Sequence, residues 1–121
     1  MPWKFKSGAP LTQQIADRLR ADILSGKYAR GGQFPTVRQL AYEAGVNPNT
    51  MQKALTALEG EGLIAARSTA GREVTTDEGI LDAARRRVSL SFAKDVAQNA
   101  KMLSVSQEEL IKYIKEVWDS E

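Results

Sequence analysis

The chain has 121 residues, which is enough for one compact domain or for a small domain with a short appendage. Its 17 Lys and Arg against 15 Asp and Glu give a formal charge of +2, and its 42% of hydrophobic residues is ordinary for a globular protein. The sequence contains neither Cys nor His. This excludes disulfides and Cys-ligated zinc and removes the commonest metal ligand and acid–base group, so we expect no metal, no cofactor and no enzyme.

Charge and hydropathy also limit the partners. Residues 1–76 carry ten Lys or Arg and six Asp or Glu, whereas residues 77–121 carry seven and nine, so a polyanion partner is expected at the basic front half. No apolar run approaches the ~20 residues of a membrane-spanning helix, and residues 1–8 are too short and too polar for a secretory signal. We expect a cytoplasmic protein that does not contact a membrane.

The first elements are an arm and a helix. Residues 3–6 alternate apolar and basic side chains, which predicts a short strand or an extended arm. Pro10 suits the first turn of a helix, and the apolar residues after it recur every four positions up to a terminating Gly26. Residues 27–35, with two Gly and one Pro, are expected to form a loop.

Two helices follow, separated by a tight turn. Thr36 and Gln39 have the spacing of a capping box, which begins a helix that Gly45 ends. Asn47 and Pro48 are the residue types preferred at the start of a helix, and apolar residues at helical spacing follow them. Two helices joined by a Gly-containing turn are a helix-turn-helix pattern.

The second of these helices has a polar outer face at positions i, i+3, i+4 and i+7, formed by Asn49, Gln52, Lys53 and Thr56. Asn and Gln pair with adenine, Lys pairs with guanine and Thr contacts the thymine methyl group. A plain solvated face is the alternative. The preceding turn favours a recognition helix, because such helices reach base edges with their N-terminal half.

A β-hairpin is predicted next. Residues 63–67 and 73–76 read as short strands around a turn at Gly71, and a hairpin directly after a helix-turn-helix is a wing. Arg67 and Arg72 lie at or near its tip, where they would reach phosphate or the minor groove. Ordinary surface arginines are the alternative.

The back half predicts two more helices. One starts at residues 76–78 and extends to about Ala100, and the other begins at a second capping box, Ser106 with Glu109. The basic run 85–87 is interpreted as a solvated face rather than a second DNA contact, because a helix spreads three consecutive residues around its circumference. Large apolar stripes on both helices predict a dimer interface, with packing back onto the front domain as the alternative. The expected interface residues are Leu81, Val88, Phe92, Ile111, Ile114 and Trp118.

Together these patterns predict a mainly α fold with a small β-hairpin. Residues 1–76 are expected to form a winged helix-turn-helix DNA-binding domain, and residues 77–121 a helical dimerisation segment.

Residues 10–76 resemble the winged-helix domain of GntR-type bacterial transcription regulators. An ordered set of short motifs carries the resemblance: Pro10-Leu11, Gln14-Ile15, Ile23-Leu24-Ser25-Gly26, Phe34-Pro35-Thr36-Val37-Arg38-Gln39-Leu40-Ala41, Gly45-Val46-Asn47-Pro48-Asn49-Thr50 and Leu58-Glu59-Gly60-Glu61-Gly62-Leu63-Ile64. The segment 47–54 looks like the YtrA-like subfamily, whose members have a similar length and two helices after the wing.

The resemblance implies roles for matching positions. Thr36 and Arg38 would meet the DNA backbone, and the wing would use Arg67 and Gly71. The wing departs from the family pattern in two places, because Thr69 replaces its first glycine and Arg72-Glu73 replace a small hydroxyl and an aromatic residue. The recognition surface would consist of Asn47, Asn49, Thr50, Gln52 and Lys53.

We therefore expect a homodimeric, sequence-specific regulator of transcription, in such families most often a repressor, on a pseudo-palindromic DNA operator. A small-molecule effector between the back helices stays open, because no residue marks its site. A winged-helix module that binds only proteins is the alternative from another class. An enzyme is disfavoured, since the acids lie mainly on predicted helix surfaces and caps and no Gly-rich phosphate loop appears.

Overall fold

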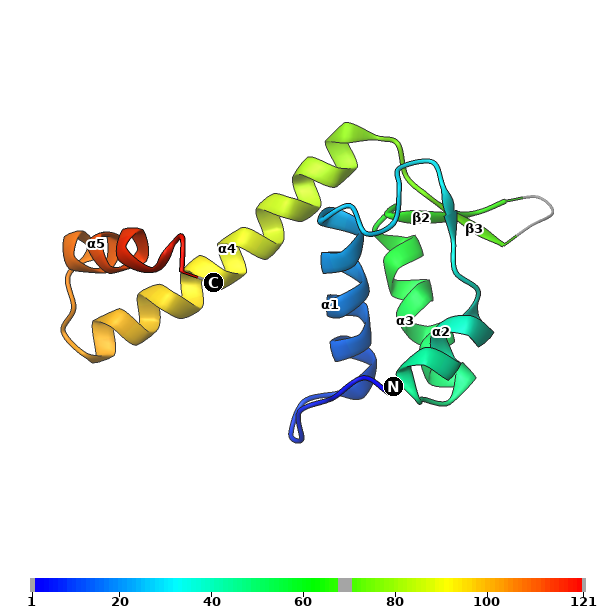
Figure 1. The fold of residues 1–121 in the computed structure, drawn as a ribbon, viewed down its shortest axis with the longest axis horizontal. Coiled ribbons are helices and arrows are strands. Elements are labelled where there is room, and N and C mark those ends of the chain that lie inside the picture. Colours follow the sequence, from blue (N-terminus) through cyan, green and yellow to red (C-terminus); the bar gives the residue numbers. More distant parts are fainter. Residues whose placement is uncertain (1, 68–70, 121) are drawn as a thin grey trace. The chain divides into compact units, whose positions relative to one another are not determined.

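The computed structural model describes residues 2–67 and 71–120, and it divides into two compact units, Met1–Ala84 and Arg85–Glu121. The boundary therefore lies after Ala84, beyond the division at 76/77 that the sequence suggested. The described residues form five helices and three short strands, which are labelled in Figure 1. In chain order these are α1 (Leu11–Leu24), β1 (Gln33–Phe34), α2 (Val37–Ala44), α3 (Pro48–Gly60), β2 (Ile64–Ala66), β3 (Arg72–Val74), α4 (Glu78–Met102) and α5 (Gln107–Val117).

Local signals set the helix ends where the sequence placed them. The Gln39 backbone N–H donates to Thr36 Oγ1 over 3.1 Å and the Gln39 side chain accepts from the Thr36 N–H over 2.8 Å, so the capping box forms. Gly45 ends α2 with a φ of +74°, in the left-handed region that favours glycine. The arm at residues 3–6 has no strand pairing, but the Trp3 N–H donates to the Ala44 C=O over 3.2 Å.

The wing belongs to a three-stranded antiparallel sheet with the order β1-β3-β2. The expectation of a loop over residues 27–35 was therefore wrong at Gln33–Phe34, which pair with Arg72 and Glu73 of β3. On β3, Val74 faces the core, and alternation along the strand places Glu73 on the opposite, outer face of the sheet.

The core of the first unit packs α1, α2 and α3 against the inner face of this sheet. Ile15, Leu19, Leu55 and Leu58 have no exposed surface, and α1 and α3 lie side by side (Figure 1). A fork of hydrogen bonds joins α1 to the C-cap residue of α3: Arg20 donates from Nε to Glu61 Oε1 over 2.8 Å and from Nη2 to Glu61 Oε2 over 2.6 Å. These contacts fix α3 on the body of the domain.

The start of α4 completes this core. Leu81 and Ala84 are both 1% exposed and belong to the same cluster as α1 and α3, which explains why the first unit extends to residue 84. Leu81 was expected at a dimer interface. The structure corrects that expectation, because the side chain is covered within its own protomer.

The second unit contains the rest of α4, a turn and α5. A capping box begins α5: the Glu109 N–H donates to Ser106 Oγ over 3.1 Å and the Ser106 N–H donates back to the Glu109 side chain. Within the described residues of this unit, Ala100 is the one buried hydrophobic residue. No helix in the described ranges combines the length and the apolar character needed to cross a bilayer.

Candidate nucleic-acid interface

The inner and outer faces of α3 have opposite characters. Met51, Ala54, Leu55 and Leu58 have no exposed surface, so the helix cannot rotate without opening the core. The outer face carries the polar residues singled out in the sequence: Asn47, Asn49, Gln52, Lys53 and Thr56 are exposed, and Thr50 is half-buried. A fixed helix that presents amides, a hydroxyl and an ammonium group suits hydrogen bonding to base edges.

Several of these groups already have partners at the helix start. The Asn49 N–H donates to Asn47 Oδ1 over 2.7 Å, so this oxygen caps α3 and the Asn47 amide N–H groups remain to donate. Gln52 Nε2 lies 3.2 Å from Thr56 Oγ1, which itself donates to the Gln52 C=O. This contact holds the Gln52 amide along the helix and leaves its Oε1 and one N–H for a base.

The N-terminus of α2 adds a second set of donors. Thr36 is the cap, and Arg38 is exposed in the first turn. Tyr42 lies one helical turn after Arg38, on the same side of α2, and 91% of its surface is exposed. Sequence reasoning missed Tyr42, since an aromatic residue in a short helix is usually counted as core. Arg38 and Lys53 have no ion-pair partner within residues 2–67 and 71–120.

The wing arginines differ from Arg38 and Lys53, because both are paired with carboxylates. Arg67 donates to Glu73 Oε2 from Nε over 2.7 Å, and its Nη2 lies 2.5 Å from the same oxygen. Arg72 donates from Nε to Glu59 Oε2 of α3 over 2.9 Å. At Gly71 the turn has a φ of +77°, and the Gly71 C=O accepts from the Arg67 N–H over 2.6 Å. Thr69, the departure noted at the tip, lies outside the described residues.

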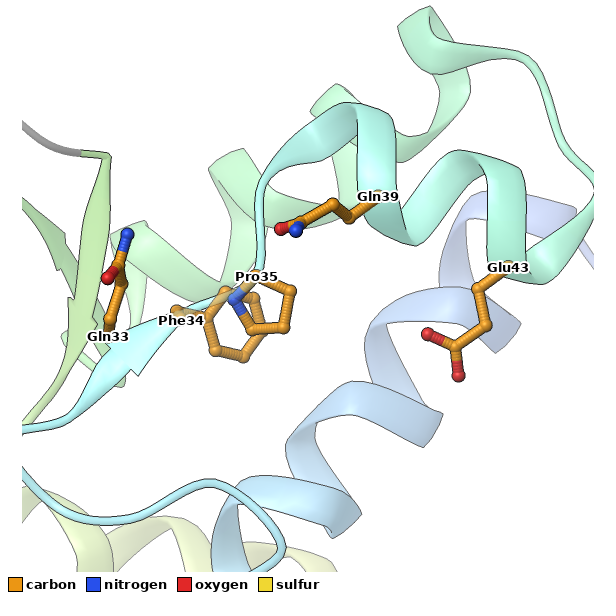
Figure 2. A pocket seen from close by; sticks show the side chains of 5 residues that line it. All are labelled: Gln33, Phe34, Pro35, Gln39 and Glu43. Atoms are coloured by element: carbon orange, nitrogen blue, oxygen red, sulfur yellow. The ribbon is translucent and has the colours of Figure 1, made fainter.

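A hollow on the same unit lies beside β1 and α2 (Figure 2), lined by Gln33, Phe34, Pro35, Gln39 and Glu43. The Gln39 oxygen is used in the cap of α2. Among these five residues the one charged group is the Glu43 carboxylate, which repels a phosphate group that comes close to it.

Tyr28 packs near this hollow, with its ring edge-on to Phe34 at a centroid distance of 5.0 Å. Burial raises the pKa of Tyr28, and the negative charges of Asp22 and Glu43 raise it further. The phenol is therefore neutral near pH 7. Within the described ranges no group of Asp and Glu has the arrangement of a metal site.

Of the six residues expected at a dimer interface, Leu81 is buried in the first unit and the other five lie in the second unit. Val88 is half-buried, and the others range from 39% to 76% exposed. The structure also shows exposed apolar residues that the sequence analysis did not single out for this face. These are Leu90, Val96, Met102, Leu103, Tyr113 and Val117.

Comparisons with known proteins identify the family and the fold of the chain. The family described as bacterial regulatory proteins, gntR family, matches residues 11–74. YhcF of Bacillus subtilis (strain 168), an uncharacterised HTH-type transcriptional regulator, is 27% identical over 93% of each chain. The HTH-type transcriptional repressor YtrA of the same organism is 29% identical over 93% of this chain and 87% of its own. The resemblance to YtrA-like GntR regulators is therefore confirmed.

Solved structures of transcription regulators have a fold similar to that of this chain. A GntR family transcriptional regulator from Listeria monocytogenes aligns with a TM-score of 0.86 and 26% identity, covering 93% of this chain and 99% of that one. AraR(DBD) in complex with operator ORE1 aligns with a TM-score of 0.53 and 26% identity, over 61% of this chain and 90% of that one. The expected fold class is confirmed, and the family and these relatives are transcription regulators. Since the family match spans more than half of the sequence, the chain belongs to the gntR family of bacterial regulatory proteins, and it carries that family's helix-turn-helix DNA-binding domain.

Proposed function

We propose that the chain is a homodimeric repressor that reads a pseudo-palindromic operator through the outer face of α3. The observation that carries the proposal is the fixed, polar face of α3, on which Asn49, Gln52 and Lys53 are exposed while the opposite side of the helix is fully buried. AraR(DBD), which shares the fold, is bound to operator DNA, and YtrA is named a repressor. A chromosomal operator as the target implies action in the cytoplasm.

Base discrimination would come from α3. The Gln52 amide, held by Thr56, is suited to adenine N6 and N7, and Lys53 is suited to guanine O6 and N7. Each well-formed bidentate contact contributes about 1–3 kcal/mol of discrimination against a wrong base.

Affinity would come from phosphate contacts around α2. The exposed Arg38 guanidinium and the hydroxyl of Tyr42 lie on one side of α2, and the helix N-terminus presents further N–H donors. Because Arg38 and Lys53 have no carboxylate partner in the described ranges, both charges are available to phosphate or bases. Such contacts make the affinity fall steeply as salt rises.

The operator symmetry follows from the proposed dimer. Exposed apolar residues such as Phe92, Ile114 and Trp118 cluster in one small unit, and a second copy related by a two-fold axis would cover them. Two recognition helices would then enter major grooves roughly 34 Å apart on one side of the duplex, which requires inverted half-sites.

The test is selection of bound sequences from random duplex DNA with the wild-type protein and with Gln52→Ala. We expect the wild type to enrich an inverted repeat, and Gln52→Ala to lose preference at one or two base pairs of each half-site while keeping the rest. Gln13→Ala is the matched control, because Gln13 is an exposed glutamine on α1 that bonds Asp17 within its own helix.

Two outcomes would contradict the proposal. Wild-type protein that enriches no sequence at moderate salt would favour a module that binds proteins instead of DNA. Equal weakening of all sequences by Gln52→Ala would reduce Gln52 to a phosphate contact.

A further inference from the structure

We infer that Glu73 competes with DNA phosphate for the wing arginine Arg67, and that it thereby sets the sequence-independent affinity of this regulator. The inference rests on the proposed function, since it requires that the wing approaches the DNA backbone. It concerns a carboxylate on the outer face of the sheet, to which neither the sequence patterns nor the comparisons assign a role.

The geometry around Arg67 shows that its guanidinium is already bound by a carboxylate. Glu73 Oε2 accepts from Arg67 Nε over 2.7 Å and lies 2.5 Å from Nη2, and Nη2 also donates to the Gly31 C=O over 3.3 Å. In β3, Glu73 is opposite Gln33 of β1 and Ala65 of β2, so its side chain stands on the middle strand of the sheet. The guanidinium is therefore drawn back toward the sheet, and two of its three nitrogens are already engaged.

The other wing arginine is also neutralised, but in a different way. Arg72 is opposite Phe34 and Ala66, on the inner side of the sheet, and its side chain is 17% exposed where it meets Glu59 of α3. This pair ties β3 to the recognition helix, and its low exposure makes it a positioning contact. The Arg67–Glu73 pair is more open, at 44% and 39% exposure, so a phosphate can reach it.

Electrostatics decides what the open pair does when DNA approaches. An exposed ion pair contributes little to folding, so exchanging the Glu73 carboxylate for a phosphate is inexpensive for the protein. The carboxylate stays close to the incoming phosphate after the exchange, at a distance where salt does not screen the repulsion completely. Arg67 thus contributes less to binding than an unpaired arginine at the same position.

Removing the competitor should strengthen the phosphate contact of Arg67. Glu73→Gln keeps the size of the side chain and one acceptor oxygen, but it removes the charge and replaces the other oxygen by an NH2 donor. We expect binding to a random-sequence duplex to become about three- to tenfold tighter. The slope of log K against log salt should steepen by at most about 0.9, the value for one whole phosphate contact, because Arg67 already makes a weakened contact in the wild type. Because phosphate carries no sequence information, the selected operator should gain by a similar factor.

The experiment measures fluorescence anisotropy of a labelled duplex of random sequence, about 30 bp long, titrated with the intact protein at several salt concentrations. Glu43→Gln is the matched control, because it makes the same change of net charge in the same unit, at a residue outside the proposed DNA surface. Glu73→Thr serves as a second variant with high β propensity, and it should show the same gain. Thermal melts confirm that each variant is folded.

A cycle with Arg67→Ala separates competition from a general charge effect. In the Arg67→Ala background, Glu73→Gln should gain no more than Glu43→Gln does. Equal effects of Glu73→Gln and Glu43→Gln in the wild-type background, or weaker binding by Glu73→Gln, would overturn the inference and identify Glu73 as a residue that merely orients Arg67. Wild-type protein that binds neither duplex would instead overturn the proposed function, so the two failures are distinguishable.

Discussion

The two compact units differ in how far their large apolar side chains are exposed. The unit up to residue 84 buries Phe34, Leu19 and Leu55 almost completely, whereas the unit from residue 85 onward leaves Met102 and Leu103 more than three-quarters exposed. The two tryptophans show the same contrast, since Trp3 is 7% exposed and Trp118 is 76% exposed. The first unit has a buried core of its own, whereas the second unit leaves most of its large apolar side chains exposed.

This difference separates two tasks. The geometry of the recognition face depends on the core beneath α3, because residues 51, 54, 55 and 58 hold that helix in place. The spacing between two recognition faces would depend on whatever covers the second unit. Mutations in the two units should therefore fail in different ways, and this expectation can be tested.

The largest effect is expected from a truncation under α3. Leu55→Ala removes a side chain with no exposed surface from the centre of the first unit. We expect the free energy of unfolding to fall by about 2–5 kcal/mol, through lost apolar burial and the cavity left behind. Urea denaturation followed by the fluorescence of Trp3, in a Trp118→Phe background, measures the first unit alone, since the chain has two tryptophans.

Leu103→Ala is the matched control, because the same truncation is made at a residue that is 76% exposed in the second unit. Its effect on the Trp3 transition should stay within about 0.5 kcal/mol at protein concentrations low enough to separate protomers. Similar losses of the free energy of unfolding from Leu55→Ala and Leu103→Ala would contradict the distinction between a buried core in the first unit and an exposed apolar surface in the second.

The next effect concerns association of the second units. Phe92→Asp places a charge on a 65% exposed aromatic position of α4, which a partner copy would have to bury unpaired. We expect a dimer for the wild type and a monomer for the variant in sedimentation at micromolar concentration. Operator affinity should fall by about a hundredfold or more, because two linked half-site contacts become independent.

Ser91→Asp adds the same charge at the neighbouring exposed residue and should leave the oligomeric state unchanged. A monomeric wild type that still binds its operator tightly would contradict the proposed dimer. Trp118 gives an independent readout, since its emission should shift to shorter wavelength on association if a partner covers it.

Elements determined by neighbouring residues could be predicted from the sequence. Elements determined by residues far along the chain could not. The capping boxes at Thr36 and Ser106 and the start of α3 at Asn47 depend on residues within one turn, and all three form as expected. Strand β1 depends on pairing with residues almost forty positions later, and its two residues sit in a Gly- and Pro-containing segment that reads as a loop.

The same limit applies to the site. Sequence patterns identified the outer face of α3, because opposite faces of a helix differ in composition. They could not reveal that Arg67 and Arg72 are held by Glu73 and Glu59, since such pairs are set by the folded structure. Leu81 was misassigned for a related reason, because an apolar stripe on one long helix does not show which of its turns belong to the core.

The smallest effect tests whether the first unit depends on polar contacts as well as apolar ones. Arg20→Lys replaces the fork on Glu61 by a single ammonium group, at a side chain only 12% exposed. We expect the free energy of unfolding of the first unit to fall by about 1–2 kcal/mol. A compact ammonium group keeps the charge but cannot reproduce all three hydrogen bonds that the Arg20 guanidinium makes to Glu61 and Asp17. Arg86→Lys on the exposed surface of α4 should leave it unchanged. An unchanged Trp3 transition for Arg20→Lys would mean that a single ammonium contact to Glu61 stabilises the first unit as well as the fork does.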